Sequence, residues 1–305
     1  MACMYPKLAY YDTRVSPARV LFKASDFWRA LDRLPDGVQS IQIPCGKCFG
    51  CLKARALAIT VRAVAESRMH LCSSFLTLTV DDEHLPLVFP HGLCHRPWQL
   101  FAKRLRKKIG SFTFLMCGEY GSRTCRPHYH ACIFGHCFDD SYYDPNIGVI
   151  SSRLLRDCWP FGNHMVADLN PNRAAYVAGY TCKDFALGRD KRFYQSRGFG
   201  LPYVRWSRRP ALGLRWLTSY YNDLLDDDFN FTFAIDGKIF NFGCRYFFEK
   251  FRLLLPDEFD TICAVRRDRL RNIDFITGIM RHERNLRACE LKQYQLKRKK
   301  ELSDL

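Results

Sequence analysis

The sequence has no long hydrophobic run and comparatively few acidic residues, and both features limit what the protein can be. No apolar stretch approaches the ~18 residues that a membrane-spanning helix needs. The opening residues, MACMYPKLAYYDTRV, lack the apolar core of a secretion signal. The 305 residues include 31 Asp and Glu against 47 Lys and Arg, a net charge of +16. We therefore expect no membrane partner and predict a nucleic-acid partner, although a basic protein without a special partner would have the same composition.

Two other features are missing. There is no internal repeat, and no Walker A stretch that would indicate a built-in helicase. Apolar residues are plentiful, at 48% hydrophobic and 14% aromatic, which predicts a folded chain rather than a disordered one. The 15 cysteines come without a secretion signal. They are therefore interpreted as reduced thiols or metal ligands rather than as a disulfide framework.

The order of the expected elements favours an α+β fold with a central antiparallel sheet and flanking helices. Residues 1–44 are expected to be irregular because prolines interrupt them. Hydrophobic periodicity predicts helices over 52–71, 97–110 and 171–185, and strands over 73–80, 111–121 and 128–135. Beyond residue 220 we expect a hairpin around Asp236-Gly237 and a charged helical tail. The predicted divisions are an N-terminal segment (1–71), a core (72–220) and an accessory C-terminal region (221–305).

The stretch RPHYHACIFG places His128 and His130 two residues apart at the start of an apolar run. Alternate residues of a strand share one face, so the two rings should point the same way. Such a pair is also common as two half-exposed rings with no ligand role. Glu119, at the end of the preceding strand, can lie across from the histidines if the strands pair antiparallel. These three donors would form an open site for Mg²⁺ or Mn²⁺, or for Zn²⁺.

Tyr176, Tyr180 and Lys183 stand at i, i+4 and i+7, positions that share one face of a helix. The same spacing is typical of two core aromatics with a lysine that reaches solvent. A tyrosine oxygen can attack a phosphodiester and form a covalent ester. A metal makes the phosphorus more electrophilic, and a lysine can stabilise the departing oxygen. Together with the histidines, the pattern favours a nuclease with a tyrosine nucleophile.

CGKCFGC spaces Cys45, Cys48 and Cys51 as metal ligands are spaced in zinc sites. Cys3 is the expected fourth ligand of a structural zinc, with Cys72 as the alternative. An iron–sulfur cluster or plain reduced cysteines would also fit the spacing.

Basic residues on the 97–110 helix and in WSRRPALGLRWL are expected to contact DNA phosphates. The residues named for this role are Lys103, Arg104, Lys107, Arg205, Arg208 and Arg209. A solvated basic face is the alternative for the helix. Trp206 and Trp216 could stack on unpaired bases or belong to the core, and the terminal KRKK is expected to be a solvated tail.

Three motifs, FLTLT, RPHYH with its upstream Glu119, and YVAGYTCK, resemble those of the HUH endonucleases that initiate rolling-circle replication. With CGKC, CGEYG and SRRPALG, they resemble the replication initiation proteins of gokushovirus-type microviruses, which are small single-stranded DNA phages. The resemblance covers roughly residues 40–215. It implies an HUH core of the ferredoxin- or RRM-like type, with His128, His130 and Glu119 as metal ligands and Tyr176 and Tyr180 as paired nucleophiles. Lys183 matches a lysine of single-tyrosine members, so its role stays open.

The resemblance also implies a reaction. One tyrosine would nick the origin of the double-stranded replicative form, retain the 5′ phosphate and leave a 3′-OH for synthesis. The second tyrosine would then allow the displaced strand to be closed into a circle. The implied setting is the bacterial host cytoplasm, with a host helicase and DNA polymerase as partners. The rival interpretations are a transposase or plasmid relaxase with the same chemistry, and a non-enzymatic zinc-containing DNA- or RNA-binding module.

Overall fold

The computed structural model describes residues 3–15, 19–22, 34–121, 124–186, 188–224, 232–241, 244–271, 283–284 and 286–295. The chain divides into two compact units, Met1–Lys53 with Asp274–Leu305, and Ala54–Ile273. The divisions expected at residues 71 and 220 stay predictions. The hairpin and helices after residue 220 share a hydrophobic cluster with the sheet that precedes them.

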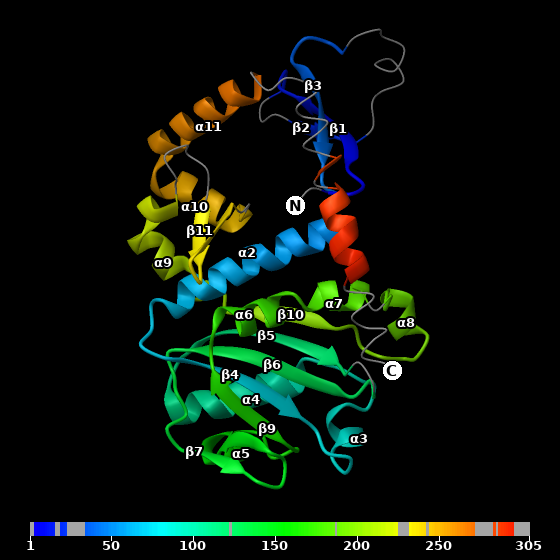
Figure 1. The fold of residues 1–305 in the computed structure, drawn as a ribbon, viewed down its shortest axis with the longest axis vertical. Coiled ribbons are helices and arrows are strands. Elements are labelled where there is room, and N and C mark those ends of the chain that lie inside the picture. Colours follow the sequence, from blue (N-terminus) through cyan, green and yellow to red (C-terminus); the bar gives the residue numbers. More distant parts are fainter. Residues whose placement is uncertain are drawn as a thin grey trace. The chain divides into compact units, whose positions relative to one another are not determined.

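A five-stranded antiparallel sheet forms the centre of the second unit, with the strand order β10-β5-β6-β4-β9 (Figure 1). Its strands are β4 (Ser73–Thr79), β5 (Thr113–Tyr120), β6 (Pro127–Phe134), β9 (His164–Asp168) and β10 (Tyr203–Trp206). The predicted α+β class and the central antiparallel sheet are confirmed. The two edge strands, β9 and β10, were not predicted. They have only 5 and 4 residues, too few for a clear alternation of apolar and polar side chains.

Each face of the sheet is covered by helices, and strand alternation decides which residues meet them. Leu76, Met116 and Tyr129 belong to one hydrophobic cluster. Phe75, Leu115 and Cys132, on the alternate positions, belong to the other. The first cluster is covered by α3 (Leu85–Val88), α4 (Arg96–Ile109) and α5 (Arg153–Cys158). The second is covered by α2 (Phe49–Ser67), α6 (Pro171–Ala178) and α10 (Arg245–Leu254).

The other elements of this unit are short or lie outside the sheet. They are β7 (Ser141–Asp144), β8 (Val149–Ser152), α7 (Tyr180–Ala186), α8 (Lys191–Gln195), α9 (Leu214–Ser219), η1 (Tyr221–Leu224), β11 (Thr232–Ile235), β12 (Lys238–Asn241) and α11 (Pro256–Arg271). The predicted hairpin is confirmed: β11 and β12 pair antiparallel across Asp236 and Gly237, which both have positive φ.

The first unit contains a three-stranded antiparallel sheet of β1 (Lys7–Asp12), β2 (Arg19–Leu21) and β3 (Val38–Ile43). The prediction that residues 1–44 are irregular is therefore wrong. Pro6 precedes β1, and Pro35 and Pro44 flank β3, so these prolines bound strands rather than interrupt them. The C-terminal KRKK lies outside the described residues.

Cys72 and Cys137 are joined by a disulfide, which corrects the expectation that the cysteines are all thiols or metal ligands. Cys72 directly precedes β4 and Cys137 follows β6. Because these strands pair antiparallel, the two Cα atoms lie 5.8 Å apart. The pairing also removes Cys72 as an alternative zinc ligand. Among the described helices, none is long and apolar enough to cross a membrane.

Candidate metal and tyrosine site

The register of β5 and β6 brings the predicted donor residues together. Glu119 pairs with His128 and Cys117 pairs with His130. The three donor side chains occupy alternate positions on the sheet face that carries α6. The expectation that Glu119 lies across from both histidines is confirmed.

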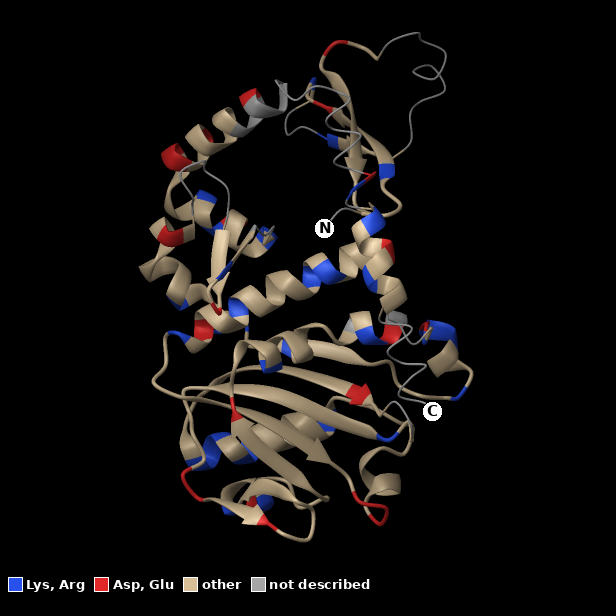
Figure 2. Cartoon of the chain, viewed as in Figure 1, with Lys and Arg blue, Asp and Glu red and all other residues tan. Residues whose placement is uncertain are grey.

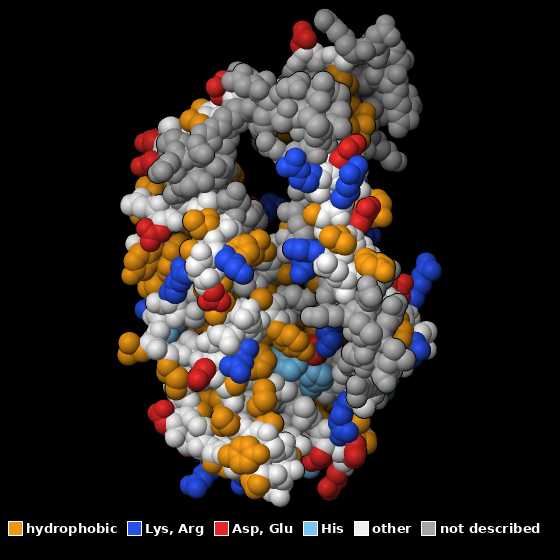
Figure 3. Space-filling view, in the orientation of Figure 1, with side chains coloured by type: hydrophobic (Ala, Val, Ile, Leu, Met, Phe, Trp, Pro, Cys, Tyr) orange, Lys and Arg blue, Asp and Glu red, His pale blue; other side chains and the backbone are white. Residues whose placement is uncertain are grey.

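The carboxylate of Glu119 is the centre of the site. Its Oε1 lies 2.8 Å from His128 Nε2 and 3.1 Å from His130 Nε2. Glu119 is 0% exposed, whereas the His128 side chain is 15% exposed. Histidine side chains reach the surface as a group on this face of the molecule (pale blue in Figure 3). The site is therefore buried at Glu119 and His130 and reaches solvent at His128.

Both imidazoles are oriented by a bond at their other nitrogen. His128 Nδ1 donates to the carbonyl oxygen of Arg126 at 3.0 Å. His130 Nδ1 lies 3.0 Å from Thr77 Oγ1. Such bonds fix the ring and turn Nε2 toward a ligand, as they do around metal-binding histidines. Thr77 was not among the predicted site residues, although it lies within the FLTLT motif.

The electrostatics of the site depend on burial and on these close partners. Burial alone would raise the pKa of Glu119, but hydrogen bonds from His128 and His130 outweigh it and hold that pKa below its ordinary value. Burial lowers the pKa of His130, and the bond to Glu119 only partly opposes this. The carboxylate therefore stays ionised, and the His130 ring favours the neutral form that ligates metals.

The donor set fits a divalent cation. Glu119, His128 and His130 each offer a ligand atom, and these atoms lie within 4.8 Å of one another. Oε1 alone has four polar side chains within hydrogen-bond distance, because Tyr176 Oη and Lys183 Nζ also lie 2.9 Å and 3.2 Å away. One carboxylate oxygen has two lone pairs and cannot bond four such groups well. Mixed imidazole and carboxylate ligands with further open positions suit Mg²⁺, Mn²⁺ or Zn²⁺.

Tyr176 lies beside this donor set. It is 44% exposed, and its hydroxyl donates to Glu119 Oε1 at 2.9 Å. Its ring packs edge-on against His130 with the centroids 5.0 Å apart. Burial of the hydroxyl, with the charge of Glu119, raises the pKa of Tyr176. Lys183 lies on the same side, with Nζ 5.8 Å from the centre of the Tyr176 ring.

Tyr180 is more deeply buried than Tyr176, although Lys183 Nζ lies near both rings, 5.8 Å from the centre of the Tyr176 ring and 5.6 Å from that of Tyr180. The helix ends at Ala178 with Gly179 as its C-cap, and α7 begins at Tyr180. Tyr180 is 1% exposed, and its hydroxyl donates to Asp184 Oδ1 at 2.9 Å. Tyr194 donates to the same oxygen at 2.8 Å. Burial and the charge of Asp184 raise the pKa of Tyr180.

The residues predicted to contact DNA fall into two groups. The α4 ribbon in Figure 2 is blue at its Lys and Arg positions, and the side chains of Lys103 and Lys107 are exposed. Arg104 instead donates to the carbonyl of Cys158 at 3.2 Å. Since α4 covers the sheet face opposite the histidines, this group does not lie on the face of the donor set.

The second basic group follows β10. Arg205 is exposed, and Arg208 and Arg209 line a cavity. The same cavity is lined by Arg106, Arg215 and Trp206. Trp216 is only 4% exposed and belongs to the core, which leaves Trp206 as the tryptophan of the pair that lines a surface.

Comparison with known proteins gives a consistent set of relatives. The family model of the replication-associated proteins of the ORF2 and gene 2 protein type matches residues 73–185, a range that contains the donor set and both tyrosines. The chain is 32% identical over 221 residues to the replication-associated protein VP4 of Bdellovibrio phage phiMH2K, covering 68% of each chain. It is 31% identical over 237 residues to the replication-associated protein ORF4 of Chlamydia phage 1, covering 73% of this chain and 57% of the relative. Spiroplasma virus 4 has a relative, the replication-associated protein ORF2, at 32% identity over 186 residues, covering 53% and 56%. No solved structure matches this chain.

Proposed function

Because this chain belongs to the family of phage replication-associated proteins of the ORF2 and gene 2 protein type, we propose that it is an origin-nicking and strand-joining HUH endonuclease. Its substrate would be the origin of the double-stranded replicative form of a small circular single-stranded DNA phage. The product of the first step would be a DNA strand attached through its 5′ phosphate to a tyrosine, with a free 3′-OH for synthesis.

One observation carries this proposal. The hydroxyl of Tyr176, which is partly exposed, lies 2.9 Å from a carboxylate oxygen that also faces two imidazoles. A bound Mg²⁺ or Mn²⁺ would polarise the phosphate and neutralise charge that develops on its oxygens. Glu119, His128 and His130 would hold that cation beside the nucleophile. A binding module without enzymatic activity would not need a tyrosine hydroxyl there.

The residues of this chain have distinct parts in the proposed step. The Tyr176 oxygen forms a bond to phosphorus while the bond from phosphorus to the 3′ oxygen breaks. The phenolic proton leaves Tyr176, and a proton is gained by the 3′ oxygen. Burial raises the pKa of Tyr176, so ionisation of the phenol needs nearby positive charge. Lys183, whose Nζ lies 3.2 Å from Glu119 Oε1, would supply part of it and stabilise the departing oxygen.

The different positions of the two tyrosines suggest an order of action. Tyr176 would make the first cut because its hydroxyl already lies at the donor set. Tyr180 would act in the joining step, after its hydroxyl has left Asp184. Transesterification keeps the number of phosphoester bonds constant, so the joining step needs no ATP. Unwinding would come from a host helicase and synthesis from a host polymerase in the bacterial cytoplasm.

The test is covalent capture of origin single-stranded DNA in the presence of Mn²⁺, read as a shifted band under denaturing conditions. We expect Tyr176→Phe to abolish most of the first-cut adduct, and Tyr180→Phe to retain it but lose circle formation. The double variant should form no adduct, and mass spectrometry should map the DNA to Tyr176 in the unmodified protein. An undiminished adduct in the double variant would refute the proposal. Adduct without circle formation would favour a transposase or relaxase.

A further inference from the structure

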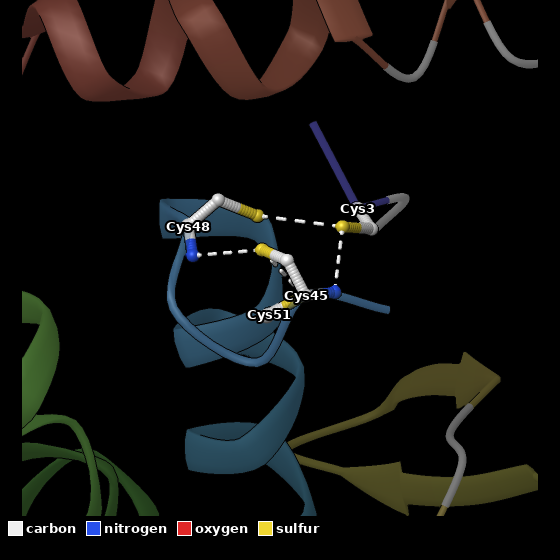
Figure 4. A group of neighbouring side chains, drawn as sticks. All are labelled: Cys3, Cys45, Cys48 and Cys51. Carbon is white, nitrogen blue, oxygen red and sulfur yellow. Dashed lines mark hydrogen bonds between the residues drawn. The ribbon is translucent and has the colours of Figure 1, made fainter. Parts of the chain in front are cut away.

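Four cysteine side chains converge at the start of α2, outside the region that the family model matches (Figure 4). Cys3 precedes β1, Cys45 and Cys48 lie in the connection from β3 and at the helix start, and Cys51 lies in the first turn. All four sulfur atoms lie within 4.8 Å of one another. The group belongs entirely to the unit that contains Met1–Lys53.

The sulfur–sulfur distances indicate a shared metal rather than disulfides. The sulfurs of Cys3 and Cys48 are 3.8 Å apart, and those of Cys45 and Cys51 are 4.0 Å apart. A disulfide bond is only about 2.05 Å long. Four sulfurs at the corners of a tetrahedron, each about 2.3 Å from a central zinc, are separated by about 3.8 Å. The observed distances therefore match the edges of a tetrahedral thiolate site.

Backbone amides point at these sulfurs. The amide of Cys45 donates to Cys3 Sγ at 3.2 Å, and that of Cys48 donates to Cys45 Sγ at 3.3 Å. The amide of Met4 donates to Cys48 Sγ at 3.3 Å. A neutral thiol is a weak acceptor, whereas a thiolate is a strong one. The three amides therefore give Cys3, Cys45 and Cys48 the kind of donor that thiolate ligands of a metal accept from.

We propose that Cys3, Cys45, Cys48 and Cys51 bind one structural zinc ion. Four protein ligands complete a tetrahedral shell and leave no position for a substrate, as in closed structural zinc sites. A cluster of several irons would have to fit metal and sulfide atoms among the sulfurs, and a group within 4.8 Å has no room for them. Each thiol that is still protonated would release its proton when the metal binds.

The small hydrophobic core of the surrounding unit explains why a bound metal would stabilise it. Among its described residues, the buried apolar side chains are few: Ala9, Val38, Cys48, Phe49 and Cys289. A unit with so small a core gains little from hydrophobic burial, and small domains of this kind commonly use a metal or disulfides instead. The zinc would tie the segment before β1 to the first turn of α2, two parts of the chain separated by more than forty residues.

The first test is the metal content of the full-length protein after dialysis against excess Mg²⁺. We expect about one zinc ion per chain. Cys48→Ser should lose it. Cys94→Ser, which changes an exposed cysteine outside the group, should keep it. The double variant His128→Ala with His130→Ala should also keep it, which separates this site from the proposed catalytic one. Equal zinc in Cys48→Ser and the unmodified protein, or loss of zinc only in the histidine variant, would overturn the proposal.

A second measurement uses the unmodified protein, so that a folding defect in a variant cannot obscure the result. Thiol alkylation followed by mass spectrometry should find the four cysteines protected, and a strong chelator should expose all four together. Replacement by Co²⁺ should give the visible absorption of a tetrahedral thiolate complex. Rapid alkylation before the chelator is added, recovery of these cysteines as disulfides, or stoichiometric iron in place of zinc would each refute the assignment.

Discussion

Two buried glutamates lie at opposite ends of strand β5, Glu119 within the strand and Glu66 beside its beginning, and their neighbours differ. Glu119 lies near the end of the strand and is 0% exposed. Glu66, from α2, is 1% exposed and accepts a hydrogen bond from Thr113 at the beginning of the strand, at 2.9 Å. Along an extended strand, Thr113 and Glu119 are roughly 20 Å apart. Both carboxylates also lie within 3.2 Å of a histidine nitrogen, so burial and a histidine partner alone do not distinguish them.

The remaining hydrogen-bond partners distinguish the two glutamates. Glu66 accepts from the Gly213 amide at 2.7 Å as well as from Thr113, so its two oxygens join α2, β5 and the turn before α9. Each Glu66 oxygen therefore accepts a hydrogen bond from a different part of the fold. Glu119 instead has four polar side chains within hydrogen-bond distance of one oxygen, among them a tyrosine hydroxyl and a lysine. A carboxylate oxygen crowded by groups that bind metals or attack phosphorus indicates chemistry, whereas a carboxylate whose remaining bonds go to the backbone and a structural hydroxyl indicates structure.

The largest expected effect is on Glu119. Glu119→Gln should slow formation of the covalent DNA adduct by about 10²–10³-fold, because an amide is a far weaker ligand for a divalent cation. Single-turnover cleavage of origin single-stranded DNA with Mn²⁺ measures this rate. Glu83→Gln changes an exposed acid and should leave the rate unchanged. A Glu119→Gln rate within threefold of the unmodified protein would contradict the proposed metal site.

Removal of Glu66 should affect folding rather than chemistry. Glu66→Ala leaves the Gly213 amide and the Thr113 hydroxyl without their acceptor, at a cost of about 3 kcal/mol in the free energy of unfolding. Urea denaturation measures this loss, and Glu66→Gln should lose less because it keeps one acceptor. At a temperature where the variant is folded, adduct formation per folded molecule should be unchanged. A stable variant that has lost cleavage would reverse the comparison.

Much of the Glu119 end of the strand could be predicted from sequence. The H-x-H spacing and the strand period of two predict that both histidines share one sheet face. An acid shortly upstream predicts that Glu119 lies on the strand paired with them. Both predictions succeed because they depend on neighbouring strands joined by a short connection. Tyr176 was found from helical spacing in the same way. The zinc-like spacing of CGKCFGC is likewise local, and a closed site needs a fourth thiolate, which predicts Cys3 as the remaining ligand.

What could not be predicted depends on long-range packing or on a single backbone turn. Gly179 ends α6, so Tyr176 and Tyr180 belong to two successive helices rather than to the one helix that the spacing predicts. The Tyr180 hydroxyl donates a hydrogen bond to Asp184, and the i+4 spacing of these two residues could have suggested this bond. The role of Glu66 depends on Gly213, which is far away in sequence. The Cys72–Cys137 disulfide follows from the pairing of β4 with β6 rather than from any local motif.

A smaller effect is expected at the Thr113 end, where Arg208 and Arg209 line the same cavity as Thr113. The double variant Arg208→Ala with Arg209→Ala should weaken binding of single-stranded DNA by about tenfold. It should also reduce the slope of log K against log salt by about one for each phosphate that no longer meets an arginine. Fluorescence anisotropy across a salt series measures both quantities. Adduct formation at saturating DNA should be unchanged.

The matched control uses the other basic group. Lys103→Ala with Lys107→Ala removes the same amount of charge from α4, which covers the face opposite the histidines. This pair should reduce DNA affinity less than the arginine pair does. A larger effect on α4 would place the DNA path on that face and separate it from the proposed reaction centre.

The smallest expected effect concerns Asp184, a partly buried carboxylate that accepts hydrogen bonds from Tyr180 and Tyr194. Burial raises the pKa of Asp184 above its ordinary value of 3.8, with the tyrosine hydroxyls only partly opposing it. For an acid whose pKa is raised by folding, the stabilising contribution is complete below pH 3.8 and is lost as the pH rises through the folded-state value. Asp184→Asn does not titrate and can still accept both tyrosine bonds on Oδ1. It should therefore be more stable than the unmodified protein at neutral pH, within about 1 kcal/mol, and this advantage should shrink toward zero as the pH falls below 3.8. Thermal melting of both proteins from acid to neutral pH measures the difference, and an advantage that grows on acidification would show that Asp184 is matched to its partners as Glu66 is.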